Sequence, residues 1–431
     1  MSANANPISN IVMSGEQKER NPSLIALVVG VIGLAIAIAG LVTGLIGSDS
    51  RPWLSWLIGV AFWMSILIGS LLLILISWVF DAGWSVIIRR QLEHIVGAFP
   101  ILALCFVPFL LVAWFSNEPG LVWKWLDLDH VLHNGSTVGE DPLYLWKSAW
   151  LDITWLTVRT LIYFTVFIGL ATLLRKFSFR LDEDGDVRWV HRSRKLAAFG
   201  LFAVGLGLTF AAVDWFMSLE FHWFSTMFGV WYFASSIRAA VAFIIIVCFF
   251  LSTRGYLKGI YGRAHRYDLG CLLLAFTIFW AYISFSQMFL IYQGNIPEET
   301  FWYNLRLYLM DDSGYSSWWY VSMALVFLHF FVPFAFLLFY SSKVHVGRLL
   351  FMAGWVLVFH VLDLYFNILP GELMTEDGTW ILRGFSVTLF DIAGLVGIGG
   401  LVIWSFLRSA AKVKPIPVKD PRILESIHHH E

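Results

Sequence analysis

Ten long apolar runs constrain the fold of this 431-residue chain more than any other feature. A helix needs about 20 predominantly apolar residues to cross the hydrocarbon core of a membrane. The runs that satisfy this requirement are 23–47, 53–80, 96–116, 149–174, 196–217, 223–251, 269–292, 317–341, 347–369 and 384–407. Soluble domains contain about 25% charged residues, whereas this chain contains 14%. The sequence therefore predicts an all-α integral membrane protein with ten transmembrane helices. Its transmembrane domain is 23–407, between an N-terminal segment (1–22) and a C-terminal tail (408–431).

The placement of Lys and Arg predicts the orientation. The loops on the side opposite the termini contain only Arg51, Lys124, Lys147, Arg306 and Arg383, whereas the side with both termini contains most of the remaining basic residues. Cytoplasmic loops of membrane proteins carry an excess of Lys and Arg. We therefore expect both termini in the cytoplasm.

Ionisable residues also occur inside or beside the apolar runs. The stretch VDWFMSLEFHWFSTMFGVWYF (213–233) contains Asp214, Glu220 and His222 among aromatic residues. Ionisable groups within a membrane are costly and usually functional. Those that fall in the predicted spans are Asp152, Arg159, Asp214, Arg238, His329, His360, Asp363 and Asp391.

The spacing of these residues suggests a proton route. Asp152 and Arg159 lie two turns apart on one helix face, and His360 and Asp363 lie three residues apart on another. At 1.5 Å per residue, Asp363 and Asp391 are expected about 10 Å below the outer end of adjacent spans. Acids and imidazoles that descend from one surface could relay protons. The predicted relay is Asp152, Asp214, His222, Asp363 and Asp391 in the outer half, then His329 and His360 further inward.

Arg159 and Arg238 are predicted to tune the pKa values of these acids. The competing interpretation is structural, because an arginine that neutralises a buried acid also holds two helices together.

The sequence predicts no redox cofactor or metal bound by this chain. The three cysteines form no CxxC pair, which argues against an iron–sulfur site. Two haem-ligating histidines would have to lie at matching depths, and His329 and His360 are expected about 4 to 5 Å apart in depth.

Three stretches carry a resemblance to a known family: DWFMSLEFHWFSTMFGVWYF (214–233), DLGCLLLAFTIFWAYISFSQMFLIYQGNIPEETFWY (268–303) and DAGWSVIIRRQLEHI (81–95). They resemble the second NrfD-like integral membrane subunit of alternative complex III, within the polysulfide-reductase-like membrane family. The resemblance spans nearly the whole chain. It implies two NrfD-like four-helix bundles plus flanking helices, in the bacterial cytoplasmic (inner) membrane.

The resemblance also implies a respiratory role, as a subunit of a quinol:cytochrome c or other electron-acceptor oxidoreductase. The implied partners are a further NrfD-like membrane subunit, an iron–sulfur subunit, multihaem and monohaem cytochrome c subunits, small membrane subunits and lipids. A terminal oxidase is a further candidate partner, and nucleic acid is not expected. Haem c and iron–sulfur clusters would belong to the partner subunits.

Three other functions remain open on the sequence alone. The chain could itself bind quinone or menaquinone through Asp214, Glu220 and His222. It could be a stand-alone proton-coupled transporter, or a passive scaffold in which the loops 117–148 and 295–315 hold partners.

Overall fold

Ten helical segments are long and apolar enough to cross a membrane in the computed structural model, which describes residues 21–133, 135–309, 314–374 and 379–429. The predicted all-α membrane fold is therefore confirmed. The spans are formed by α2 (Asn21–Ile46), α3 (Arg51–Val79), α4 (Val86–Ile95) with α5 (Phe99–Phe115), α7 (Ile153–Asp184), α8 (Arg188–Trp215), α9 (Phe228–Thr253), α10 (Arg263–Gly294), α12 (Ser317–Ala324) with the π-helical η7 (Leu325–Phe331) and α13 (Val332–Leu338), α15 (Val346–Ile368) and α16 (Leu389–Ala410).

Short elements connect these spans. The helices are α6 (Pro142–Lys147), α11 (Pro297–Leu307), α14 (Tyr340–Val344) and α17 (Ile423–Ile427), and the 3₁₀ turns are η1 (Gly83–Ser85), η2 (Val96–Ala98), η3 (Pro119–Leu121), η4 (Lys124–Leu126), η5 (Val138–Glu140) and η6 (Met217–Glu220). Strands β1 (Glu372–Met374) and β2 (Trp380–Leu382) pair antiparallel, with Leu373 opposite Ile381.

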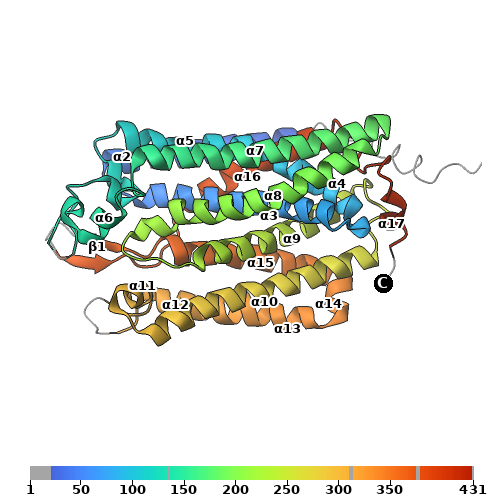
Figure 1. The fold of residues 1–431 in the computed structure, drawn as a ribbon. Helices are drawn as coiled ribbons and strands as arrows, with labels where there is room; N and C mark the ends of the chain where they lie inside the picture. The colour runs from blue at the N-terminus through green and yellow to red at the C-terminus, as the bar shows by residue number, and fades with distance from the viewer. Residues whose placement is uncertain (1–20, 134, 310–313, 375–378, 430–431) are drawn as a thin grey trace, which may run out of the picture.

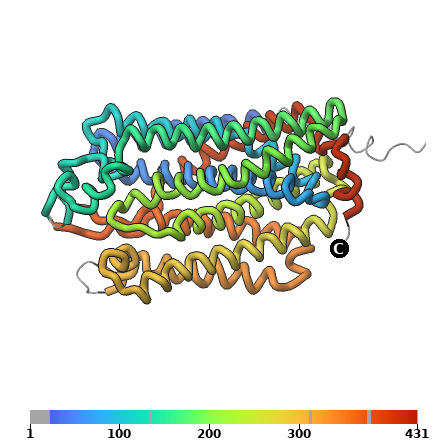
Figure 2. The backbone as a smooth tube through the Cα atoms, in the orientation of Figure 1, coloured from blue at the N-terminus to red at the C-terminus, as the bar shows by residue number. Residues whose placement is uncertain are grey.

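The long helices lie roughly along one common direction (Figures 1 and 2). By their packing, eight of the spans form two groups of four. In the first bundle, α3, α5, α7 and α8 pack in a closed cycle, and in the second, α9 packs on α10 and α15 while η7 and α13 complete the cycle. Helix α3 packs on α9 and so joins the two bundles. Helices α2 and α16 pack on each other beside the first bundle.

Glycines allow two of these contacts to be very close. A Cβ atom on Gly397 would come within 2.7 Å of the backbone nitrogen of Leu34. Because glycine has no Cβ atom, α16 can pack directly against α2. A Cβ atom on Gly69 in α3 would come within 2.0 Å of the carbonyl oxygen of Ser236 in α9. The joint between the bundles therefore has no room for a side chain at Gly69.

The two ends of the helix body differ. The loop end contains α6, α11, the β hairpin and the turn at 216–227, whereas the tail end contains α14, α17 and the turn between α7 and α8. Arg51 at the start of α3 bonds to Asp391 at the start of α16, so the preceding helix α2 runs antiparallel to α16. The start of α2 and the end of α16 therefore share the tail end. Residues 1–20 of the predicted N-terminal segment lie outside the described residues.

Two local predictions have different outcomes. The stretch RLDEDGDVRWVHR (180–192) predicts a hairpin that turns at Asp-Gly. This turn is confirmed, since α7 ends at Asp184 and Gly185 adopts a left-handed φ of 73°. The predicted start of the third span at residue 96 is too late, because the helical segment begins at Gly83. Helix α4 is charged but fully buried, since its charges are paired inside the protein.

Candidate functional site

The carboxyl group of Asp363 is the centre of a buried polar site in the second bundle. Asp363 is 2% exposed and lies five residues before the end of α15, about 8 Å from the loop end. Its Oδ2 accepts hydrogen bonds from the indole nitrogens of Trp280 (2.9 Å) and Trp231 (3.2 Å) and from the hydroxyl of Ser235 (3.4 Å). Its Oδ1 accepts from the amide of Asn367 (3.2 Å). We call these five residues the Asp363 cluster.

The Asp363 cluster contains no ion pair among the described residues. Arg238 interacts electrostatically with Asp363, but its guanidinium bonds to another residue. Neutral donors therefore stabilise the carboxylate. A carboxyl group held in this way can gain or lose a proton without separating a bound cation.

Arg238 is bound by His329 instead. Its NH1 lies 2.8 Å from Nε2 of His329, and its NH2 donates to the carbonyl oxygen of the same residue at 2.5 Å. In an α-helix this carbonyl would accept from the N–H of residue 333, which is a proline and has no N–H. The π-helical segment η7, which includes His329, ends just before this proline. The proline thus makes room for an arginine–histidine contact between α9 and η7.

The contact also fixes the tautomer of His329. Arginine has only donors, so Nε2 must accept and the ring proton lies on Nδ1. This Nδ1 and the Nε of Arg238 are buried and have no hydrogen-bond partner among the described protein atoms. The hydroxyls of Ser236 and Ser284 in the same bundle are also buried, and they too have no hydrogen-bond partner among the described protein atoms. Bound water commonly supplies such partners.

His360 lies between these groups in depth and faces α3. Its Nε2 is 2.9 Å from the hydroxyl of Ser65, so it does not bond to Asp363 although both lie on α15. Measured from the loop end at 1.5 Å per residue, Asp363, His360, Arg238 and His329 lie at about 8, 12, 15 and 18 Å. These four ionisable groups of the second bundle therefore lie at successive depths.

Asp214 occupies a different kind of site in the first bundle. Arg159 binds both of its carboxylate oxygens, with Nε at 2.8 Å and NH2 at 3.1 Å. Trp150 and Tyr163 each donate a further bond to it, at 2.9 and 2.8 Å. Arg159 thus pairs with Asp214 and not with Asp152, which lies on the same helix. Asp214 and Arg159 therefore form a bidentate ion pair that links α8 to α7.

Two other acids differ from their predicted positions. Asp152 is the half-buried N-cap of α7, where it accepts from the backbone N–H of Trp155 at 3.0 Å, so the prediction that it is a buried span residue is wrong. Asp391 is buried, but it is the third residue of α16 and lies close to the loop end. The predicted depth of about 10 Å is too large because α16 begins at Leu389, after Thr388 closes a capping box with Asp391. Asp391 pairs with Arg51 at 2.7 Å.

His222 lies between two carboxylates at the loop end. Its Nε2 is 3.1 Å from Asp141 and its Nδ1 is 3.3 Å from Glu220. Burial alone would lower the pKa of His222, but the bonds to Glu220 and Asp141 outweigh burial and raise its pKa. Asp214 bonds elsewhere, so the structure does not assemble the proposed quinone contacts Asp214, Glu220 and His222 into one site. Both ring nitrogens of His222 are already engaged.

The charged form of His222 is expected to stabilise the loop end. Because its folded-state pKa is raised, this stabilisation is complete below the unfolded pKa of about 6.5 and is lost as the pH rises through the folded-state value. We expect the free energy of unfolding to fall by on the order of 1 kcal/mol over that window. Thermal unfolding of the purified protein as a function of pH measures the fall. The His222→Gln variant should not show this pH-dependent fall in stability. If its pH profile were the same as that of the unchanged protein, the contacts of His222 with Asp141 and Glu220 would not be the cause of the fall.

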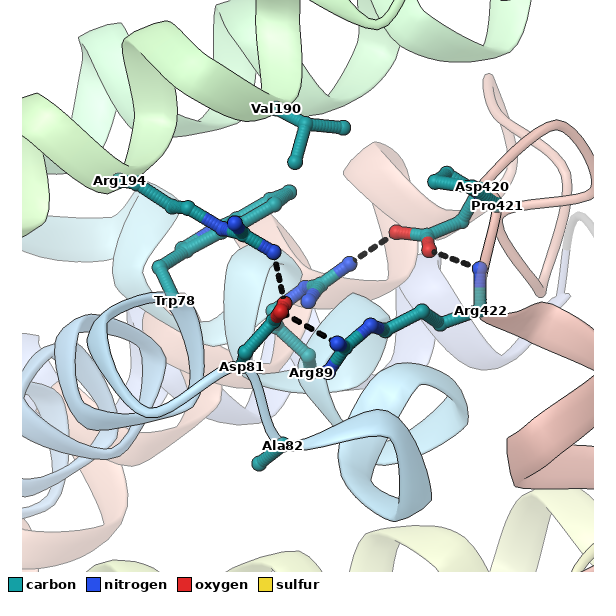
Figure 3. A pocket seen from close by; sticks show the side chains of 9 residues that line it. All are labelled: Trp78, Asp81, Ala82, Arg89, Val190, Arg194, Asp420, Pro421 and Arg422. Carbon is teal, nitrogen blue, oxygen red and sulfur yellow. Dashed lines mark hydrogen bonds and ion pairs between the residues drawn. The ribbon is translucent and has the colours of Figure 1, made fainter.

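An ion cluster that the sequence does not predict lies at the tail end (Figure 3). Arg89 binds Asp420 of the C-terminal tail, and Asp81 binds both Arg194 of α8 and Arg422 of the tail. A cavity of about 20 Å³ lies among these side chains, which is room for about one water molecule. Charge pairs therefore fasten the tail to α4 and to the turn between α3 and α4, and α8 binds the same turn through Asp81.

The same cluster continues into the first bundle. Glu93 accepts from Ser178 at 2.7 Å and lies 3.2 Å from Arg90, which in turn binds Asp182 at 2.5 Å. The helical spacing of Arg89, Arg90 and Glu93 was the one sequence signal for this network, since the two arginines lie four and three residues before the acid. The acids from α7 and the tail come from far along the chain, so no local pattern indicates them.

Among the described residues, no three His, Cys, Asp or Glu side chains gather in a way that could hold a metal ion. His329 and His360 each already bond through Nε2 to Arg238 and Ser65, so ligation of a haem through these atoms would require both bonds to break. A comparison with models of protein families gives no match, and neither does a comparison with curated proteins.

Proposed function

We propose that this chain is a membrane subunit of a quinol-oxidising respiratory complex of the alternative complex III type, and that it conducts protons without a redox cofactor of its own. The observation that carries the proton-conducting part is the Asp363 cluster, a buried carboxyl group that has no cation partner among the described residues and lies above His360, Arg238 and His329. Membership of the complex rests on the resemblance in the stretches 81–95, 214–233 and 268–303. The ten candidate spans are compatible with both parts.

In the proposed route, Asp363 takes up and releases the proton. The indoles of Trp231 and Trp280 stabilise its carboxylate form, and the edge of Trp280 also contacts the ring of His329, with centroids 4.4 Å apart. The Nε2 of His329 can accept a proton only after Arg238 withdraws, because the guanidinium donates to that atom. The Arg238–His329 contact would therefore control transfer further inward.

The remaining acids are assigned structural roles in this proposal. Asp214 and Asp391 are held by Arg159 and Arg51, and breaking a buried ion pair costs about 3–5 kcal/mol. Asp152 caps a helix at its surface. The proposed proton route therefore runs through the second bundle.

The implied partners are an iron–sulfur subunit, multihaem and monohaem cytochrome c subunits, a further NrfD-like subunit and small membrane subunits. Quinol would be oxidised elsewhere in the complex, since the two ring nitrogens of His222 are already bonded to Asp141 and to Glu220. Affinity purification of the tagged chain from its own membranes in mild detergent tests this assignment. We expect c-type haem absorbance, iron–sulfur resonances and quinol:cytochrome c activity in the same fraction. A pure chain without haem would overturn the assignment to this complex.

One observation favours a second candidate, a stand-alone proton-coupled transporter. The span at α12–α13 is interrupted by η7 and Pro333, and interrupted helices are typical of transporter binding sites. The same purification separates the two functions, because a transporter would purify as an active single chain.

A further inference from the structure

The hairpin between α7 and α8 gathers three arginines around one indole ring at the tail end. The guanidinium carbons of Arg188 and Arg192 lie 4.9 Å from the ring centroid of Trp189, and that of Arg180 lies 5.2 Å from it. Trp189 is 3% exposed and packs on Phe177 of α7. A buried ring thus holds cationic groups from two helices close to one another.

The positive charge of this group is only partly balanced. Arg188 pairs with Asp184 and Asp186, whereas none of the described ion pairs includes Arg180 or Arg192. Both side chains are exposed. Two guanidinium groups beside the same ring repel each other, and a bound anion would reduce this repulsion.

Further exposed lysines extend the patch along the same helix faces. Lys176 lies one turn before Arg180 on α7, and Lys195 lies about one turn after Arg192 on α8. We call Lys176, Arg180, Arg192 and Lys195 the hairpin patch.

The surface becomes apolar directly beyond the hairpin patch, toward the middle of the span. On α8, Phe199 and Phe202 are 67% and 68% exposed, and Leu206 follows on the same face. On α7, Leu173 is exposed in the corresponding place. A charged group at the level of the helix ends, followed by an apolar strip along the helices, matches an amphiphile that has an anionic head and hydrocarbon chains.

We propose that the hairpin patch binds an acidic phospholipid. The phosphate diester would accept hydrogen bonds from Arg180 and Arg192, whose planar guanidinium groups suit phosphate oxygens. Lys176 and Lys195 would add positive potential on either side. The acyl chains would lie along Phe199, Phe202 and Leu206. This inference rests on the multi-pass membrane fold and is independent of the proposed respiratory role.

Lipid retention by the purified protein, in whatever assembly it forms, tests the proposal. The protein is delipidated, titrated with phosphatidylglycerol or phosphatidylcholine in detergent, and the bound lipid is counted by native mass spectrometry. Each basic side chain near an anionic headgroup typically contributes about fivefold in affinity. We therefore expect the Arg180→Gln/Arg192→Gln variant to bind phosphatidylglycerol about 30-fold more weakly than the unchanged protein, with little change for phosphatidylcholine.

Two controls separate the site from general electrostatics. Lys258→Gln/Arg348→Gln removes the same charge from exposed positions elsewhere at the tail end and should change phosphatidylglycerol binding less than twofold. Glycerol 3-phosphate at millimolar concentration should not displace the lipid, because it lacks the chains. Equal losses in the two double variants, or no preference for phosphatidylglycerol, would overturn the proposal. Displacement by glycerol 3-phosphate would show a phosphate site and contradict the lipid assignment.

Discussion

Asp363→Asn is expected to abolish proton transfer through the second bundle while the protein still folds and assembles. Asparagine keeps the size of the side chain and can still accept from Trp280 and Trp231 through its carbonyl oxygen, but it cannot take up a proton near neutral pH. Because no described ion pair includes Asp363, the substitution breaks no direct contact with a cation. Loss of a proton-transferring group typically lowers the rate by about 10²–10⁴-fold. Proton release that accompanies quinol oxidation can be measured in proteoliposomes made with the purified complex. We expect its rate to fall at least about 100-fold.

Asp152→Asn is the matched control for this measurement. It makes the same carboxyl-to-amide change in a residue that caps α7 and lies outside the buried route. Asparagine is itself a good N-cap residue, so stability and proton release should both remain close to those of the unchanged protein. If Asp363→Asn released protons as fast as Asp152→Asn does, Asp363 would not belong to a proton route.

Gly69→Ala is expected to destabilise the joint between the two bundles. The added Cβ atom would lie 2.0 Å from the carbonyl oxygen and 2.5 Å from the carbonyl carbon of Ser236, and both are backbone atoms that cannot rotate away. Helix α9 would have to move away from α3. Overpacking a core typically lowers the free energy of unfolding by about 1–3 kcal/mol. We expect Gly69→Ala to lie near the upper end of this range, because the clash is with backbone atoms. The yield of folded protein and its thermal unfolding midpoint in detergent measure the loss.

Gly205→Ala gives the opposite sign and serves as the control. Gly205 lies in α8, and a Cβ atom there would meet no other atom within 4 Å. Alanine is more favourable than glycine in a helix interior by about 0.5–1 kcal/mol, so this variant should be equal to the unchanged protein or slightly more stable. If both alanine variants unfolded at the same temperature, close packing at Gly69 would not be what joins the bundles.

The number of spans, the helical class and the turn at Asp184–Gly185 could be predicted from the order of the amino acids alone. These properties depend on local composition, because the cost or gain of placing each residue in a membrane adds up along a run of about 20 residues. A left-handed turn position likewise depends on one residue, since glycine adopts it without steric cost. The same reasoning identified Asp214, Asp363, Asp391, Arg238 and His329 as ionisable groups inside or beside the spans.

Only the tertiary structure decided which of these groups meet. Asp214 pairs with Arg159 from the neighbouring helix, Asp391 pairs with Arg51 from far along the chain, and Asp363 meets two indoles. The partner of a buried charge depends on how each helix is rotated and which helices adjoin it, and packing across the whole bundle sets both. Spacing along one helix can place two residues on the same face, but it cannot say what lies opposite that face.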